Sequence, residues 1–136
     1  MQILTEILEL ITSNRIEVTD ITRNVDAAIA ECGLKNGLVN IYSKHSTSAL
    51  FINENEAGLV EDYVDLIEKL VPTGKNYRHD RIDNNADSHL RSLIIGNNET
   101  IPFDNGSMNL GTWQSVFFLE MDGPRNRRIT ITIMGE

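Results

Sequence analysis

Two long β-rich runs close the chain and constrain its fold more than any other feature. The first, at residues 107–121, ends in the apolar string VFFLEM, and the second, at residues 127–134, reads RRITITIM. Isoleucine alternates with threonine in the second run, which is the pattern of a strand with one buried face. The segment between them, DGPRN at residues 122–126, predicts a hairpin connection. The chain is therefore expected to build a largely antiparallel sheet.

Upstream segments add further strands to this sheet. They are expected at residues 2–11, 15–21, 37–45, 49–53 and 99–103. The first segment, QILTEILELI, also fits a helical period, but Asn14 follows as a turn residue, and this favours a strand. In the segment at 37–45, the alternation places His45 at the strand end, on the same face as Val39 and Ile41.

Three helices are expected between the strands, at residues 22–33, 56–74 and 84–96. Thr22, Asn55 and either Asn84 or Asn85 are the expected caps. The middle helix has one apolar stripe, and its acidic residues indicate a solvated face. Helices in the middle of the chain and strands at both ends predict an α+β fold with a mostly antiparallel sheet or sandwich. The 136 residues suggest a single domain, spanning 1–136.

The charge balance excludes some classes of partner. The net charge is -8, whereas nucleic acids and anionic membranes both select basic surfaces. No apolar run approaches the ~20 residues of a membrane span, and the N-terminus lacks a signal-peptide pattern. A cytoplasmic location is therefore expected. The one cysteine, Cys32, indicates a buried small hydrophobe rather than a catalytic thiol.

The three histidines offer two interpretations. His45 ends a strand, His79 lies in a polar loop, and His89 lies on or beside the buried face of a helix. They are either three unrelated side chains or the ligands of one metal, because three histidines with an open fourth position form a catalytic type of zinc site. Glu54 is a candidate general acid or base in either case, although surface solvation would also explain it.

Two segments are candidates for anion binding. The hydroxyls of Ser46, Thr47 and Ser48 could bind a phosphate or carboxylate, or bond to their own backbone at the end of a strand. A serine nucleophile is a further possibility, although no G-x-S-x-G elbow occurs. The cluster GPRNRR contains Arg125, Arg127 and Arg128, which suits either phosphate recognition or salt bridges to neighbouring strands or subunits. The one tryptophan, Trp113, could form the floor of a pocket or fill a core.

These segments together resemble a known family. The motifs HSTSALFINENE, VPTGKNYRH, NNADSHL, LGTWQ and DGPRNRR occur in the order found in the YjbQ-like family of uncharacterised small bacterial and archaeal proteins. The match runs from about residue 40 to the C-terminus. The resemblance implies an α+β fold assembled as a homotrimer, with one clustered site.

The resemblance also implies which residues form that site. The family histidines fall on His45, His79 and His89, in the position of metal ligands. The other motif residues are Thr47, Ser48, Asn53, Glu54, Gly111, Thr112, Trp113, Gln114 and Arg125. Arg127 joins them from the arginine cluster. The chain departs from the family pattern before His89, where Asn84 and Asn85 replace acids, and neutral amides bind hard cations less well.

Some members of the family are described as having a secondary thiamine-phosphate synthase activity. That transferase joins a pyrimidine diphosphate to a thiazole phosphate and releases pyrophosphate, with a divalent metal. The first hypothesis is therefore a metal-dependent enzyme acting on a small phosphorylated metabolite, with Glu54 as acid–base residue. Three histidines favour zinc, and magnesium could arrive with a diphosphate. The alternatives are a non-catalytic module that binds a small anion or metal, and a structural trimer with the histidines in its interfaces.

Overall fold

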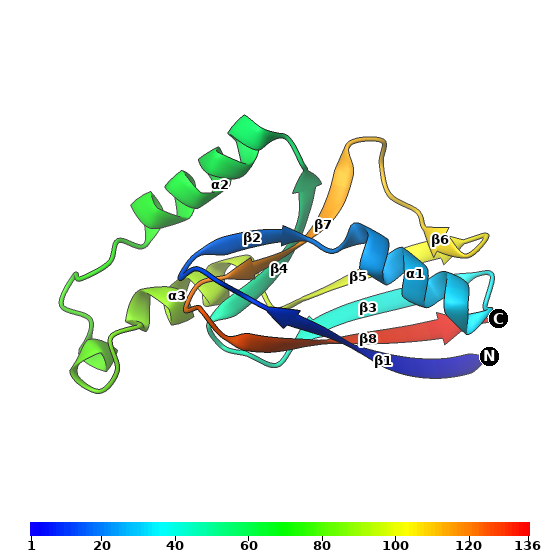
Figure 1. Ribbon diagram of the computed structural model, residues 1–136, viewed down its shortest axis with the longest axis horizontal. Helices are drawn as coiled ribbons and strands as arrows, with labels where there is room; N and C mark the ends of the chain where they lie inside the picture. Colours follow the sequence, from blue (N-terminus) through cyan, green and yellow to red (C-terminus); the bar gives the residue numbers. More distant parts are fainter.

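Two antiparallel sheets contain all the strands of the chain (Figure 1). The computed structural model describes residues 1–136. The larger sheet has the order β1-β8-β3-β5-β6, and its strands span Gln2–Ile11, Asn126–Gly135, Gly37–Ser43, Asn98–Asp104 and Ser107–Met108. The smaller sheet has the order β2-β7-β4, with strands at Glu17–Asp20, Gln114–Glu120 and Ser48–Glu54. The expected α+β fold with antiparallel pairing is confirmed.

The main core lies between the inner face of the larger sheet, one face of the smaller sheet and helix α1 (Thr22–Cys32). Along β8, the inward positions Ile129, Ile131 and Ile133 are buried, as the alternation of isoleucine and threonine predicts. Cys32 packs at the edge of this core, and its thiol donates to the Ile29 carbonyl at 3.0 Å. Cys32 is partly buried rather than fully buried as expected, but its packing agrees with the expected role as a small hydrophobe.

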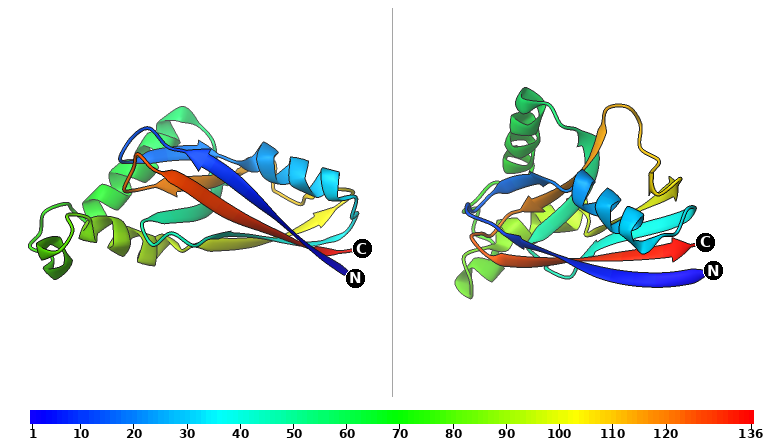
Figure 2. Two further views of the ribbon diagram at one scale, coloured as in Figure 1. Left: turned by 60° about the horizontal axis from the view of Figure 1, so that its bottom comes forward. Right: turned by 45° about the vertical axis from the view of Figure 1, so that its right-hand side comes forward.

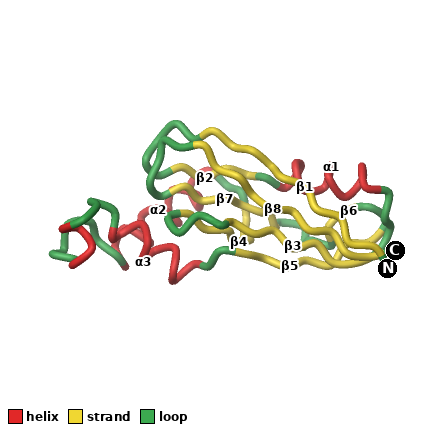
Figure 3. Tube along the Cα trace, turned by 90° about the horizontal axis from the view of Figure 1, so that it is seen from below, coloured by secondary structure: helices red, strands yellow, loops and turns green.

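The outer face of the larger sheet carries several exposed apolar side chains. Figure 3 views the chain from this side, with β1, β8 and β3 next to one another. The exposed residues are Ile3, Ile7, Leu38, Tyr42 and Met134. The register places Ile3 beside Met134 and Met134 beside Leu38, so these side chains form a continuous strip across three strands.

Helix α2 (Ala57–Leu70) lies against the other side of the smaller sheet, and the views of Figure 2 show it projecting from the body of the molecule. None of its residues is fully buried. The expected cap, Asn55, is wrong: Glu56 caps the helix, accepting hydrogen bonds from Gly58 N–H and Leu59 N–H. The amide of Asn55 instead donates to Asp20 at 2.9 Å.

The expected hairpin at 122–126 is also wrong, because β7 and β8 belong to different sheets. Strand β7 pairs with β2 and β4 along its two edges, and β8 pairs with β1 and β3. Neither strand has an edge left for the other. The segment is therefore a crossover that carries the chain from the smaller sheet to the larger one.

A short 3₁₀ helix, η1 (Arg78–Arg81), and helix α3 (Ala86–Ile95) follow α2; α3 packs beside β4, and η1 lies against α3 at one end of the molecule (Figure 1). No helix of the chain combines the length and the apolar character that crossing a membrane requires.

Candidate functional site

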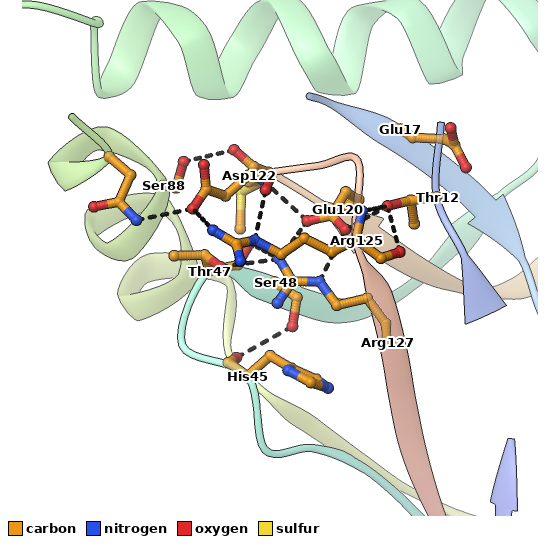
Figure 4. Close-up of polar contacts among 12 residues, drawn as sticks. Thr12, Glu17, His45, Thr47, Ser48, Ser88, Glu120, Asp122, Arg125 and Arg127 are labelled. Carbon is orange, nitrogen blue, oxygen red and sulfur yellow. Dashed lines mark hydrogen bonds and ion pairs between the residues drawn. The ribbon is translucent and has the colours of Figure 1, made fainter. Parts of the chain in front are cut away.

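A buried ion pair joins the two sheets where the chain crosses between them. Arg127, at the start of β8, donates from Nε and Nη2 to the carboxylate of Glu120, at the end of β7 (Figure 4). Their side chains are 3% and 0% exposed. Arg127 Nη2 also donates to the hydroxyl of Thr47 at 2.9 Å, and the Thr12 hydroxyl donates to Glu120 at 2.7 Å. The pair therefore links β8 and β7 with the β3–β4 turn and the end of β1.

The environment keeps Glu120 ionised. Burial by itself raises the pKa of this carboxyl, but the hydrogen bonds from Arg127 and Thr12 outweigh burial and hold the pKa below its ordinary value. The backbone N–H of Asp122 adds a third hydrogen bond at 3.0 Å. The charged Glu120 carboxylate and the charged Arg127 guanidinium thus hold Thr12 and Thr47 in fixed positions.

The β3–β4 turn presents His45 and its hydroxyl neighbours. The hydroxyls of Ser43 and Ser48 lie 2.7 Å apart, and Ser48 also donates to the backbone carbonyl of His45 at 3.2 Å. Ser48 is fully buried, so it stabilises the turn rather than contacting a ligand. Its expected role in substrate binding stays a prediction, and the burial of Ser48 does not support it. Ser46 is exposed at the tip of the same turn.

A chain of polar contacts runs from the crossover segment to the histidines. Arg125 pairs with Asp122 at 2.9 Å, and Asp122 accepts from the amide of Asn85 at 2.8 Å. The carbonyl oxygen of Asn85 lies 3.0 Å from His79 Nε2, which is therefore the donor. The ring of His79 makes an edge contact with His89, with 4.9 Å between ring centroids.

Burial raises the pKa of the Asp122 carboxyl, and hydrogen bonds from Asn85 and Arg125 lower it by more, so its pKa lies below the ordinary value. Asp122 is therefore a fixed negative charge beside Arg125. This carboxylate holds the guanidinium in one orientation while leaving it half exposed, with 50% of the side chain accessible.

These residues surround a hollow of about 390 Å³, which we call the polar pocket. Its lining consists of Lys44, His45, Ser46, Thr47, Asp83, Asn85, His89, Asp122, Arg125 and Arg127. None of the ten is hydrophobic. An open hollow with hydroxyls, imidazoles and cations on its walls offers many hydrogen bonds to a small polar ligand.

His45 lies in the wall of this pocket with one ring nitrogen occupied. Its Nε2 accepts a hydrogen bond from the backbone N–H of Arg128 at 3.1 Å, so the proton of the neutral ring resides on Nδ1. Burial, followed by the positive charge of Arg127, lowers the pKa of His45 below its ordinary value. The ring is accordingly a neutral hydrogen-bond donor at neutral pH.

The three histidines do not meet as one ligand set in the single chain. His79 and His89 are in contact, while His45 and His89 both line the polar pocket. No group of three or more His, Cys, Asp or Glu side chains is placed to hold a metal ion. The bond from Arg128 N–H to His45 occupies a nitrogen that coordination would need. The fit to a three-histidine metal site is therefore incomplete.

Helix α3, which carries His89, is braced by a second buried network. Asp87 pairs with Arg15 at 3.0 Å and with Arg91 at 3.2 Å, and it accepts from the hydroxyl of Thr73 at 3.0 Å. Arg91 is itself buried and donates to the Val71 carbonyl. The network ties α3 to the β1–β2 turn and to the segment after α2, so His89 has a fixed position.

The other expected site residues lie at the opposite end of the smaller sheet. We call this group the Trp113 cluster; its members are Asn53, Glu54, Gly111, Thr112, Trp113 and Gln114. Glu54 pairs with Gln114 in the register, while Ser48 pairs with Glu120 beside the polar pocket. Six residues of extended strand separate these two positions, or about 20 Å. The expected site is thus divided in two within one chain.

Comparison with known proteins identifies the family of the chain. The family model described as "UPF0047 protein YjbQ-like" matches residues 6–136. The chain belongs to this family. The match begins well before residue 40, where the recognisable motifs start, so the family pattern includes the first strand and helix as well.

Relatives in the UPF0047 family match over nearly their whole length. A UPF0047 protein of Methanothermobacter thermautotrophicus is 52% identical over 136 residues, covering 100% of this chain and 95% of the relative. One from Archaeoglobus fulgidus is 48% identical, covering 91% and 96%. Among solved structures, a YbjQ-like protein of unknown function from Sulfolobus solfataricus P2 has a TM-score of 0.96 at 36% identity, with 99% of each chain covered. A hypothetical protein from Aeropyrum pernix K1 gives 0.94 at 39%, covering 98% and 99%.

Several residues of the polar pocket in this UPF0047 chain were missed by sequence reasoning. They are Lys44, Asn85, Asp122 and the buried Glu120 beneath. Glu120 had a usable signal, because it shares the inward face of β7 with Val116 and Phe118. Arg127 likewise precedes Ile129 by two residues on β8. Two opposite charges on the inward faces of two apolar strands point to a buried ion pair.

Proposed function

We propose that the polar pocket binds the phosphate or diphosphate group of a small metabolite. The observation that carries this proposal is the all-polar lining, in which Lys44, Arg125, His45 and Ser46 converge on one hollow. Lys44 forms no ion pair within the chain, and Arg125 is half exposed. Cationic donors next to hydroxyls and an imidazole N–H suit the oxygens of a phosphate.

Phosphate chemistry in this pocket uses the chain's own groups. A departing diphosphate gains negative charge, and fixed cations at that position stabilise it. The buried pair of Arg127 and Glu120 is rigid, so Thr47 and the His45 turn are held before the ligand arrives. The reaction class proposed is transfer onto or from a phosphorylated metabolite, with thiamine-phosphate synthase-like chemistry as the specific case. Glu54 is the proposed acid–base residue.

A divalent metal forms a second part of the proposal. The contact between His79 and His89 supports zinc binding by this pair, with His45 as third ligand once it releases Arg128 N–H. Zinc would supply Lewis-acid activation of a phosphoryl oxygen when bound. Magnesium carried by a diphosphate is the alternative, because Mg²⁺ prefers oxygen ligands.

Assembly as a homotrimer in the cytoplasm completes the proposal. The exposed apolar strip on the outer face of β1, β8 and β3 supports an interface between copies, because such strips are unusual on monomers. The acidic composition with one cysteine supports the location.

The alternative is a binding module for small anions or metals that performs no turnover. The distance of Glu54 from the polar pocket favours this alternative. Of the two carboxylates that line the pocket, Asp122 is paired with Arg125, and only Asp83 forms no ion pair. A product assay separates the two functions. Purified protein would be incubated with a pyrimidine diphosphate, a thiazole phosphate and Mg²⁺ or Zn²⁺, and the products followed by mass spectrometry.

Enzymatic function predicts a condensed product that Arg125→Ala abolishes and Lys35→Ala retains, because Lys35 lies two residues before β3, at the end of the strand away from the polar pocket. Tight pyrophosphate binding without product would favour the binding module. Elemental analysis of wild type and His89→Ala, purified without a chelator or a histidine tag, tests the metal: the zinc proposal predicts near-stoichiometric metal that the variant loses.

A further inference from the structure

The polar pocket lacks one part that a site for an organic phosphate requires. None of its ten lining residues is hydrophobic. Sites for small metabolites combine a few polar groups with apolar or aromatic surface that covers the organic portion of the ligand. The adjoining hollow shares His45 and His89 with the pocket and adds only Tyr42 and Leu93 as hydrophobic residues. One chain therefore provides the phosphate-binding half of such a site and little of the apolar half.

The missing properties occur together in the Trp113 cluster. Trp113 is 73% exposed, and an indole ring is a strong anchor when it becomes buried against a partner. Its loop is held in place: Gly111 N–H donates to the side-chain carbonyl of Gln114 at 2.9 Å, and Gln114 N–H donates to the Gly111 carbonyl at 3.0 Å. The chain therefore presents a large aromatic side chain on an ordered loop with nothing covering it.

The Trp113 cluster cannot reach the polar pocket of its own chain. Both lie on the smaller sheet, but at opposite ends of β4 and β7, as the register of Glu54 with Gln114 and of Ser48 with Glu120 shows. The separation is about 20 Å along an extended strand. Trp113 and Glu54 can meet a polar pocket only if that pocket belongs to another copy.

The charges of the two ends are complementary. The Trp113 cluster contains Glu54, and Glu56 follows two residues later; Asp20 accepts a hydrogen bond from the intervening Asn55, so three carboxylates gather at this end. The lining of the polar pocket carries Lys44, Arg125 and Arg127 against Asp83 and Asp122, so its balance is positive. An acidic end that meets a basic end gives a head-to-tail contact, and repeated head-to-tail contacts close into rings.

We infer that the site is composite: the Trp113 cluster of one copy closes the polar pocket of a second copy. Trp113 then supplies the aromatic surface for the organic part of the ligand, and Glu54 acts in trans as the acid–base residue. The role of the pocket in this inference rests on the proposed function. The contact between copies rests only on the exposure and position of the Trp113 cluster.

The test uses Trp113 fluorescence, because Trp113 is the one tryptophan of the chain. Pyrophosphate with Mg²⁺ is the probe, and its binding is measured separately by calorimetry. In the wild type, pyrophosphate binding should change the emission of Trp113. Two variants, neither of which should show a fluorescence response to pyrophosphate by itself, are then unfolded and refolded together to form hybrid assemblies. Trp113→Phe retains an intact pocket without a tryptophan, and Arg125→Ala retains the tryptophan with a defective pocket.

A pyrophosphate-dependent signal from the hybrids, absent from either variant alone, can arise only between copies and is the expected result. Lys44→Ala replaces Arg125→Ala if the latter does not fold. Hybrids that assemble and bind pyrophosphate but stay silent would overturn the composite site while leaving the proposed function intact.

If the wild type does not bind pyrophosphate, the proposed function fails, and acrylamide quenching decides the contact by itself. Trp113 should be severalfold less accessible to acrylamide in the assembled protein than after dilution to single chains. Equal accessibility in both states, or a chain that stays monomeric at every concentration, would overturn the inference.

Discussion

Glu120 and Arg127 come from different sheets and form a buried ion pair beneath the polar pocket, with Thr12 and Thr47 completing its hydrogen bonds. The pair closes the inward faces of β7 and β8, where both strands otherwise carry apolar residues. Its position makes stability and pocket geometry depend on the same two charges.

Arg127→Met should destabilise the fold by about 3–5 kcal/mol, because it leaves the Glu120 carboxylate buried without its partner. Arg128→Met is the matched control: Arg128 is 65% exposed and lies 3.6 Å from Glu9, so its loss should cost less than about 1 kcal/mol. Urea denaturation measures both. A double variant, Glu120→Gln with Arg127→Met, should be more stable than Arg127→Met alone. Equal losses at positions 127 and 128 would contradict the account.

Acid should destabilise the protein through its hydrogen-bonded carboxyls. Glu120, Asp87 and Asp122 have pKa values lowered in the folded state, so the unfolded chain binds more protons as the pH falls. Their contribution is complete above the unfolded values, near about 4, and is lost as the pH falls through the folded values. Melting temperature measured against pH should therefore drop steeply below about pH 4. Glu120→Gln should give a shallower slope, and an unchanged slope would exclude this carboxyl as a contributor.

The cap of α2 offers a local test. Glu56→Ala removes the acceptor of the Gly58 and Leu59 N–H groups and should cost about 1 kcal/mol. Glu61→Ala, on the exposed face of the same helix, should change the free energy of unfolding by a few tenths of a kcal/mol at most. Chemical denaturation of the two variants is the measurement, and indistinguishable stabilities would show that Glu56 is not the cap.

His45 should titrate below the ordinary histidine value of about 6.5, because burial and the charge of Arg127 disfavour its protonated form. Its ring signals in an NMR pH titration give the midpoint directly. Pyrophosphate in the polar pocket should raise that midpoint, since a nearby anion stabilises the imidazolium. A midpoint at or above about 6.5 in the free protein, or one that pyrophosphate does not move, would place His45 outside this environment.

Alternating patterns predicted the fold well, but they could not assign strands to sheets. The apolar run of β7 and the Ile–Thr alternation of β8 were correctly interpreted as strands, yet the segment between them crosses sheets. A crossover between sheets and a hairpin can have the same turn composition. Which of the two forms depends on whether other strands already occupy the edges of β7 and β8. Strand β1 occupies one of these edges: it pairs with β8, although more than a hundred residues of sequence separate the two strands.

The candidate site was predictable in its residues and unpredictable in its arrangement. His45, Thr47, Arg125 and Arg127 were named from sequence, and they surround one pocket. The Trp113 cluster was assigned to the same site, but the length of β4 separates it from that pocket. Sequence motifs identify residues that act together without revealing whether they meet within one chain or between copies.

Calorimetric titration with pyrophosphate and Mg²⁺ tests the central claim most directly. The account predicts one site per chain in the wild type and in Lys35→Ala. Arg125→Ala and Lys44→Ala should each weaken binding roughly tenfold or more, as the loss of a charge-assisted hydrogen bond implies. Absence of binding in the wild type, or affinity unaffected by both substitutions, would contradict a phosphate-binding role for the polar pocket.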